Sequence, residues 1–276
     1  MSSTVQTPQP YVSGLTPAGP NIVNVIRSEW TKIWSVRSTM WTLLIGFVLT
    51  VGLGALICWG TEANYSHLHP ADKATLDPTS ISLAGLVFGQ LALAVFGVLF
   101  ISSEYSTGGI RTTLTAVPQR VRLLTAKAIV LLVISLVVGM VSSFVAFFIG
   151  QAFLSRVGIE AHLGDPDVMR AVIGGGLYLM ASAMFGFALG ALLRHSAAGI
   201  SLAIALLLVV PPLTNLLPGD WGHWIEKYFT SNAGQQITSV LPQGDALSPW
   251  AGYAVFTLWW LVILVIAGAL MSRRDA

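Results

Sequence analysis

Six long and almost uncharged apolar segments constrain most strongly what this chain can fold into. They cover residues 39–59, 80–101, 123–149, 171–193, 196–217 and 250–271. The apolar core of a bilayer is about 30 Å thick, so a helix needs about 20 apolar residues to cross it, and each segment has that length. Residues 202–210 are apolar on every face, whereas a strand of a membrane barrel alternates. The sequence therefore predicts an all-α integral membrane protein with six transmembrane helices, forming one domain over residues 39–276.

The composition supports the membrane assignment. Charged residues make up only 9% of the chain and hydrophobic residues 54%, whereas soluble domains carry about 25% charged residues. Cys58 is the single cysteine, so an intrachain disulfide and a zinc site built from several cysteines are both excluded. No basic patch interleaved with aromatic residues is present, and we expect no nucleic-acid partner.

The positive charges predict the orientation of the chain in the membrane. Ten of the 14 Lys and Arg residues fall on one side of the six-helix topology: Arg27, Lys32, Arg37, Arg111, Arg120, Arg122, Lys127, Arg194, Arg273 and Arg274. The other side holds Lys73, Arg156, Arg170 and Lys227. Because loops rich in Lys and Arg stay in the cytoplasm, we expect both termini there.

The N-terminal region divides into a tail and a helix. Residues 1–20 are rich in Ser, Thr, Gln and Pro and contain no charge, which predicts a disordered cytoplasmic tail. Residues 21–38 predict an amphipathic helix in the membrane interface, with Ile26, Trp30 and Ile33 on the apolar face and Arg27 and Lys32 on the other. Two interpretations remain open: a lipid anchor, or an elbow that also touches a cytoplasmic partner.

The connection between the fifth and sixth segments predicts a re-entrant element on the outer side. Trp221, Trp224, Ile225 and Tyr228 follow helical spacing, and so do Ile237, Val240 and Leu241. Pro211 and Pro212 remove backbone donors within the fifth segment, which should kink or break its helix, and we expect a broken helix that leads into this element.

Small residues predict close contacts between helices. Gly85 and Gly89 lie in the second segment, and Ser182, Gly186 and Gly190 in the fourth. This spacing allows two backbones to approach, either within one chain or between two chains.

A polar stretch over residues 103–120 separates the second and third segments. Gly108 and Gly109 end the preceding helix, because glycine adopts turn conformations that other residues avoid. Ile110, Leu114 and Val117 then fall on one face of a helix of about two turns, which Pro118 ends. A helix this short is unstable alone in water, so it needs a surface to pack against.

This stretch resembles the cytoplasmic coupling helix of permease subunits of ABC-2-type ATP-binding-cassette transporters, a family of bacterial exporters. The resemblance rests on Glu104-Tyr105, Thr107-Gly108-Gly109, Arg111, Leu114 and Pro118-Gln119-Arg120. It implies an exporter permease of the bacterial cytoplasmic membrane that forms the pathway with a second copy or a sister permease. The apolar crossings with few charged residues favour a hydrophobic or amphipathic substrate. The resemblance also implies coupling to a separate ATPase dimer, which binds the ATP and Mg, so this chain has no catalytic role and binds no cofactor or metal. The implied coupling residues are Glu104, Tyr105, Gly108, Gly109, Ile110, Arg111, Leu114, Val117, Pro118 and Arg120.

The sequence allows other interpretations of this stretch and of the function of the chain. None of the lysines lies in a Walker A motif, so the chain has no P-loop of its own. The stretch can also be a simple turn, with Glu104 either a surface anchor or paired locally with Arg111 or Arg120. A non-transporting immunity or sensory subunit remains an alternative function. An intramembrane hydrolase is another alternative, and His195 near Ser201 is the nearest approach to its catalytic residues.

Overall fold

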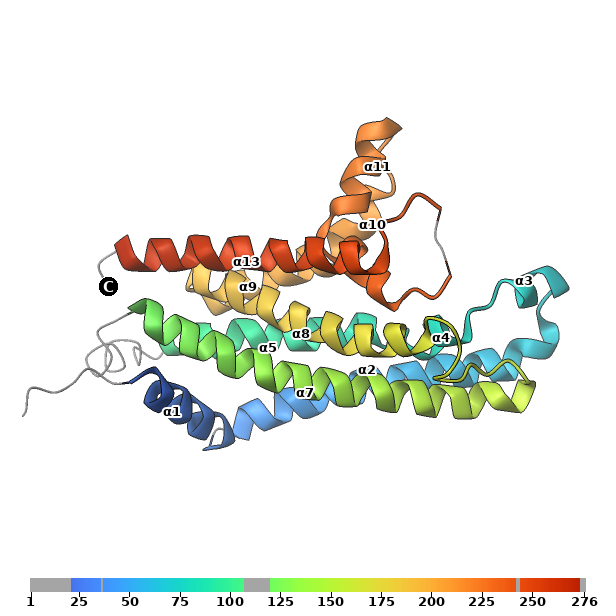
Figure 1. Ribbon diagram of the computed structural model, residues 1–276, viewed down its shortest axis with the longest axis horizontal. Coiled ribbons are helices and arrows are strands. Elements are labelled where there is room, and N and C mark those ends of the chain that lie inside the picture. Colours follow the sequence, from blue (N-terminus) through green and yellow to red (C-terminus); the bar gives the residue numbers. More distant parts are fainter. Residues whose placement is uncertain (1–20, 36, 107–119, 242–243, 274–276) are drawn as a thin grey trace, which may run out of the picture.

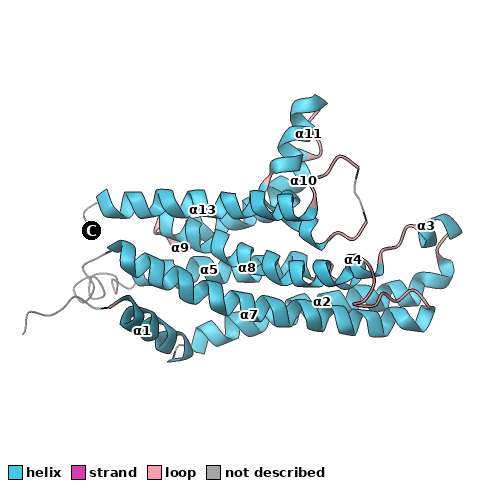
Figure 2. Cartoon of the chain, viewed as in Figure 1, coloured by secondary structure: helices cyan, strands magenta, loops and turns pink. Residues whose placement is uncertain are grey.

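The computed structural model describes residues 21–35, 37–106, 120–241 and 244–273. These residues form helices joined by loops, with no strand among them (Figure 2). Six of the helical stretches are long and apolar enough to cross a membrane: Ser38–His67, Pro78–Tyr105, Val121–Val157, Val168–Leu193, Ser196–Thr214 and Pro249–Met271. The predicted class, all-α with six membrane-spanning helices, is therefore confirmed.

The helices that build these spans lie side by side along the long axis of the molecule (Figure 1). They are α2 (Arg37–Asn64), α4 (Pro78–Ser82), α5 (Leu86–Ser106), α7 (Arg120–Leu154), α8 (Val168–Leu193), α9 (Ser196–Ile204), the π-helix η3 (Ala205–Val209), α10 (Val210–Thr214) and α13 (Pro249–Arg273). The shorter elements are α1 (Ile22–Ser35), η1 (Tyr65–His67), α3 (Pro70–Ala74), η2 (Ser155–Val157), α11 (Gly219–Tyr228), α12 (Thr230–Gln235) and η4 (Gln236–Thr238). We call the end of the bundle that carries α1 and the C-terminal end of α13 the α1 end. We call the opposite end, which carries α3, α4 and α11, the α11 end.

Most spanning helices extend beyond the apolar segments that predicted them. The clearest cases are α2, which starts at Arg37 and ends at Asn64, and α7, which starts at Arg120. Polar residues in terminal turns still form helical backbone hydrogen bonds, but they do not register in an apolar window. The apolar segments therefore predict the hydrocarbon-spanning part of each helix better than its ends.

The α8 helix lies at the centre of the bundle. Inside the protein, 83% of its spanning window is buried, against at most 56% for the other five spans. It packs on α5 through small residues: a Cβ at Gly186 would collide with the backbone of Ala94, and one at Gly97 with that of Ala183. The predicted close approach at Gly186 thus occurs within one chain.

The fifth span does not break at its prolines. Its regular α-helix ends at Ile204, the π-helix η3 follows, and Pro211 and Pro212 lie in the first turn of α10, so the helical path continues to Thr214. The predicted break is therefore wrong. A proline at position 211 cannot donate to the carbonyls four and five residues earlier, those of Leu207 and Leu206.

Two hydroxyl groups of α12 replace these missing donors. Ser231 Oγ donates to the carbonyl of Leu207 over 3.1 Å, and Thr230 Oγ1 to that of Leu206 over 2.9 Å. Both side chains come from residues that are fully buried. The prolines thus leave two backbone carbonyls of η3 without helical donors. The hydroxyl groups of α12 bind these carbonyls and hold α12 against the fifth span.

The helix predicted around Trp221 is confirmed as α11, which stands away from the bundle across its long axis (Figure 1). The second predicted fragment is helical only at Ile237, which lies in η4, whereas Val240 and Leu241 follow the end of η4 at Thr238. The re-entrant placement of these elements in a membrane stays a prediction.

The α1 helix confirms a helix within residues 21–38, and its placement in the membrane interface stays a prediction. Val25, Glu29 and Ile33, each four residues apart, are buried. Trp30 and Trp34 are 40% and 62% exposed. The interior of the protein therefore receives a stripe that contains a carboxylate, and the tryptophans point outward. The predicted tail, residues 1–20, lies outside the described residues.

Candidate functional site

A cluster of four charged residues joins three elements at the α1 end of the bundle. Lys127 of α7 donates from Nζ to Glu29 Oε2 of α1 over 2.5 Å and to Glu104 Oε1 of α5 over 2.8 Å. Lys32 of α1 pairs with the same Glu104 oxygen and lies 3.9 Å from Glu29 Oε1. We call these four residues the charge cluster. It connects α1 to the end of α5 and to the start of α7.

Three members of the charge cluster are buried. The side chains of Lys127, Glu29 and Glu104 are 1%, 4% and 8% exposed, whereas that of Lys32 is 47% exposed. Removing charges from water costs several kcal/mol per ion, so such groups persist only when opposite charges and hydrogen bonds offset the loss. Two lysines balance two glutamates here, and Lys127 Nζ also lies 5.3 Å from the centre of the Phe100 ring.

The position of Glu104 in α5 strengthens its need for cationic partners. It lies in the last turn of a helix that ends at Ser106. The C-terminal end of a helix carries partial negative charge, which disfavours a carboxylate. The two lysines, supplied by α7 and α1, offset that repulsion. Among the described residues, Glu104 Oε2 has no hydrogen-bond partner.

The sequence predicted only part of this site. The interpretation of Glu104 as a surface anchor is wrong, because this residue is 6% exposed. Lys127 belongs to the basic residues of the predicted cytoplasmic side, yet its side chain is buried in the bundle. No sequence pattern singles out Glu29. One signal was available, because Lys127 falls inside the third apolar segment, where an ionisable residue implies a buried partner.

Most of the predicted coupling residues cannot be placed. Gly108, Gly109, Ile110, Arg111, Leu114, Val117 and Pro118 lie outside the described residues, and Arg120 is described only as the first residue of α7. Tyr105 is half-buried, with its hydroxyl 3.8 Å from Met271 Sδ and the Arg194 guanidinium 5.6 Å from its ring centre. The coupling role of all these residues stays a prediction.

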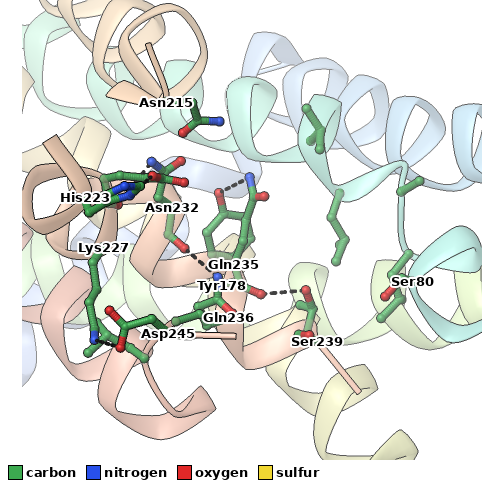
Figure 3. Close-up of a pocket in the computed structure, with 18 residues that line it drawn as sticks. Ser80, Tyr178, Asn215, His223, Lys227, Asn232, Gln235, Gln236, Ser239 and Asp245 are labelled. Atoms are coloured by element: carbon green, nitrogen blue, oxygen red, sulfur yellow. Dashed lines mark hydrogen bonds and ion pairs between the residues drawn. The ribbon is translucent and has the colours of Figure 1, made fainter. Parts of the chain in front are cut away.

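A second candidate site is a cavity of about 620 Å³ at the α11 end, which we call the α11 cavity (Figure 3). One wall comes from α4, α5 and the residues between them, and the other from α11, α12, η4 and the loop before α13. Tyr178 of α8 lies at its base. Its hydroxyl donates to Gln90 Oε1 and accepts from Gln235 Nε2 over 3.2 Å, so a polar chain runs from the bundle interior to the cavity.

Comparison with protein-family models places the chain. Residues 25–211 match the model of the ABC-2 family transporter protein, a range that covers more than half of the chain and contains the charge cluster. The chain belongs to the ABC-2 transporter family. This ABC-2 protein is therefore a multi-pass membrane subunit with the role of a transport permease, and membrane subunits of its family generally partner with ATPase subunits. Comparison with curated proteins gives no match. The match to the ABC-2 model ends before α11 and α12, so it assigns no role to the α11 cavity.

Proposed function

We propose that the chain is the membrane-spanning subunit of an ABC-2-type exporter of the bacterial cytoplasmic membrane. A separate ATPase dimer binds ATP and Mg and docks on the stretch 103–120 at the α1 end. The α1 end and both termini are cytoplasmic, and a second copy or a sister permease completes the pathway. The substrate is amphipathic or hydrophobic.

The observation that carries the proposal is the charge cluster. Its members Glu104 and Lys127 lie on the two helices that enter and leave the stretch 107–119, and Glu29 lies on α1. The cluster makes these three segments one mechanical unit, because moving any one of them alone separates buried opposite charges. A displacement of the docking stretch is thereby transmitted to α5, which packs along the central α8.

Leu114→Asp tests the docking step. We expect the variant to insert normally but to lose the ATPase subunit on purification in mild detergent, because a carboxylate on the Ile110/Leu114/Val117 face cannot pack in an apolar groove. Leu216→Asp is the matched control. It places the same change at the α11 end, on a residue that is 77% exposed, and should retain the ATPase. A full complement of ATPase on Leu114→Asp would refute the docking proposal.

A further inference from the structure

The hydrogen bonds around the α11 cavity leave several side-chain acceptors without a donor. Four amide side chains line it, Asn215, Asn232, Gln235 and Gln236, and the last three of these are hydrogen-bonded within the protein. Asn232 Nδ2 donates to Thr214 Oγ1 and to the Glu226 carbonyl, over 3.0 and 3.2 Å. The carbonyl accepts only, and Thr214 uses its own proton on the Pro211 carbonyl, so this orientation of the Asn232 amide is required by its partners.

The two glutamine amides each donate one N–H within the protein. Gln235 Nε2 donates to the Tyr178 hydroxyl, and Gln236 Nε2 donates to the backbone carbonyl of Asn232 over 3.4 Å. In the described part of the chain, no hydrogen bond ends on the side-chain oxygen of Asn232, Gln235 or Gln236. These three amide oxygens can therefore accept from a ligand that brings N–H or O–H donors.

The charged groups of the cavity add to this preference. Lys227 Nζ pairs with Asp245 Oδ1 over 3.0 Å, as Figure 3 shows, and His223 Nδ1 lies 3.8 Å from Glu226 Oε2. These four are the ionisable side chains on the α11 and loop wall, and Tyr178 is the one at the base. Two carboxylates face one lysine, so with a neutral His223 the cavity carries one net negative charge.

The opposite wall of the cavity is apolar. Leu83, Ala84, Leu86 and Val87 supply it, with Ser80 at its edge (Figure 3). Ser80 is already occupied, because its hydroxyl donates to Asp77 Oδ2 over 2.6 Å. A ligand that fits both walls has a cationic, hydrogen-bond-donating group on one side and an apolar body on the other.

We propose that the α11 cavity binds a primary ammonium group of an amphipathic molecule, with its apolar part against Leu83, Leu86 and Val87. The ammonium provides three N–H donors for the amide oxygens and a positive charge for the Glu226 and Asp245 carboxylates. This inference rests on the proposed function in one respect: it names a cationic amphiphile as the class of molecule that the permease moves.

Three matched probes test the ligand chemistry on the purified full chain in lipid nanodiscs, by calorimetry against empty nanodiscs. Dodecylamine carries charge and donors, dodecyltrimethylammonium carries the same charge without N–H donors, and dodecanoate carries the opposite charge. Dodecylamine should give a saturable heat of binding, the quaternary ion a weaker one, and dodecanoate none. Equal binding of all three would overturn the proposal, because it would indicate apolar partition alone.

Charge variants then place the binding in the cavity. Asp245→Asn should weaken dodecylamine binding about twofold to fivefold, the range for an exposed charge pair, since the Asp245 side chain is 96% exposed. The double variant Glu226→Gln/Asp245→Asn changes the net charge of the cavity from −1 to +1, and should favour dodecanoate over dodecylamine. Asp220→Asn is the matched control, because it removes an exposed carboxylate of α11 that does not line the cavity. A loss in the control equal to that in Asp245→Asn would overturn the assignment.

The amide contribution is tested separately with Gln236→Leu, which keeps the charge and removes one acceptor. Binding of dodecylamine should fall more than binding of the quaternary ion, since only the amine uses the amide oxygen. An equal fall for both probes would refute the role of the amides. If the ammonium proposal fails, the probes do not bind in the cavity, but the ATPase still co-purifies with the permease. If the proposed function fails, the Leu114→Asp variant retains the ATPase. The two failures are therefore distinguishable.

Discussion

Lys127 shows how one residue can determine the arrangement of three elements. Its ammonium group is buried among α1, α5 and α7, and its two carboxylate partners come from residues 98 and 23 positions away. The interaction is costly to form, because all three ions lose water, but it is far more costly to leave incomplete. The buried charges therefore determine where α1, α5 and α7 meet.

Lys127→Met should lower the free energy of unfolding by about 3–5 kcal/mol, because it removes the buried cation shared by two buried carboxylates and leaves them only the half-exposed Lys32. Lys32→Met should cost less than about 1 kcal/mol, since that lysine is half-exposed and Lys127 still neutralises Glu104. The measurement is the unfolding midpoint of the purified protein in mild detergent. A further variant, Glu29→Gln/Glu104→Gln/Lys127→Met, removes the charges together and should recover part of the loss. Equal midpoints for the two single variants would refute the role of Lys127.

At the scale of the element, α5 and α8 show how small residues bring two helices together. A Cβ at Gly186 would meet the backbone of Ala94, and one at Gly190 would approach the Val98 carbonyl to 2.9 Å. In a membrane, lipid is as apolar as leucine, so close backbone contact rather than hydrophobic exclusion holds helices together. The packing of α8 in the bundle centre thus depends on positions where no side chain fits.

Gly186→Ala should destabilise the protein, whereas Gly52→Ala should leave it unchanged or slightly more stable. Both glycines lie within spanning helices, but a Cβ at Gly52 meets nothing within 4 Å, so alanine there gains helix propensity without a collision. The shift at Gly186 should be several degrees in the apparent melting temperature, in line with the 1–3 kcal/mol of an overpacked core. A Gly186→Ala variant as stable as Gly52→Ala would show that α5 and α8 can separate without cost.

The sequence predicted elements well and their partners poorly. Apolar length alone located all six spans, because each crossing must satisfy its own backbone whatever its neighbours are. It failed at Pro211, where two hydroxyls of α12 supply donors that no local pattern reveals. It also gave no role to Glu29, whose carboxylate pairs with a lysine 98 residues later. Interactions between distant segments are what a single sequence leaves undetermined.

At the scale of the whole molecule, exposed tryptophans gather at both ends of the bundle. Trp34 and Trp41 are 62% and 63% exposed near the α1 end, and Trp59 and Trp250 are 55% and 58% exposed toward the α11 end. Tryptophan prefers the interface between lipid and water. Along α2, Trp41 and Trp59 are separated by about 27 Å at 1.5 Å per residue, close to the thickness of the apolar core. The belts fit a protein that crosses the bilayer along its long axis.

The positive charges predict the orientation of this axis, and the orientation can be measured directly. In a Cys58→Ala background, Thr31→Cys places a thiol on an exposed position of α1 and Asp220→Cys places one on an exposed position of α11. A membrane-impermeant maleimide should label Asp220→Cys in intact cells, and Thr31→Cys only after permeabilisation. The opposite labelling pattern would place the charge cluster and the stretch 103–120 on the extracellular side of the membrane, where no ATP is available to an ATPase. An ATPase could not then dock there, so this measurement tests the orientation and the proposed function together.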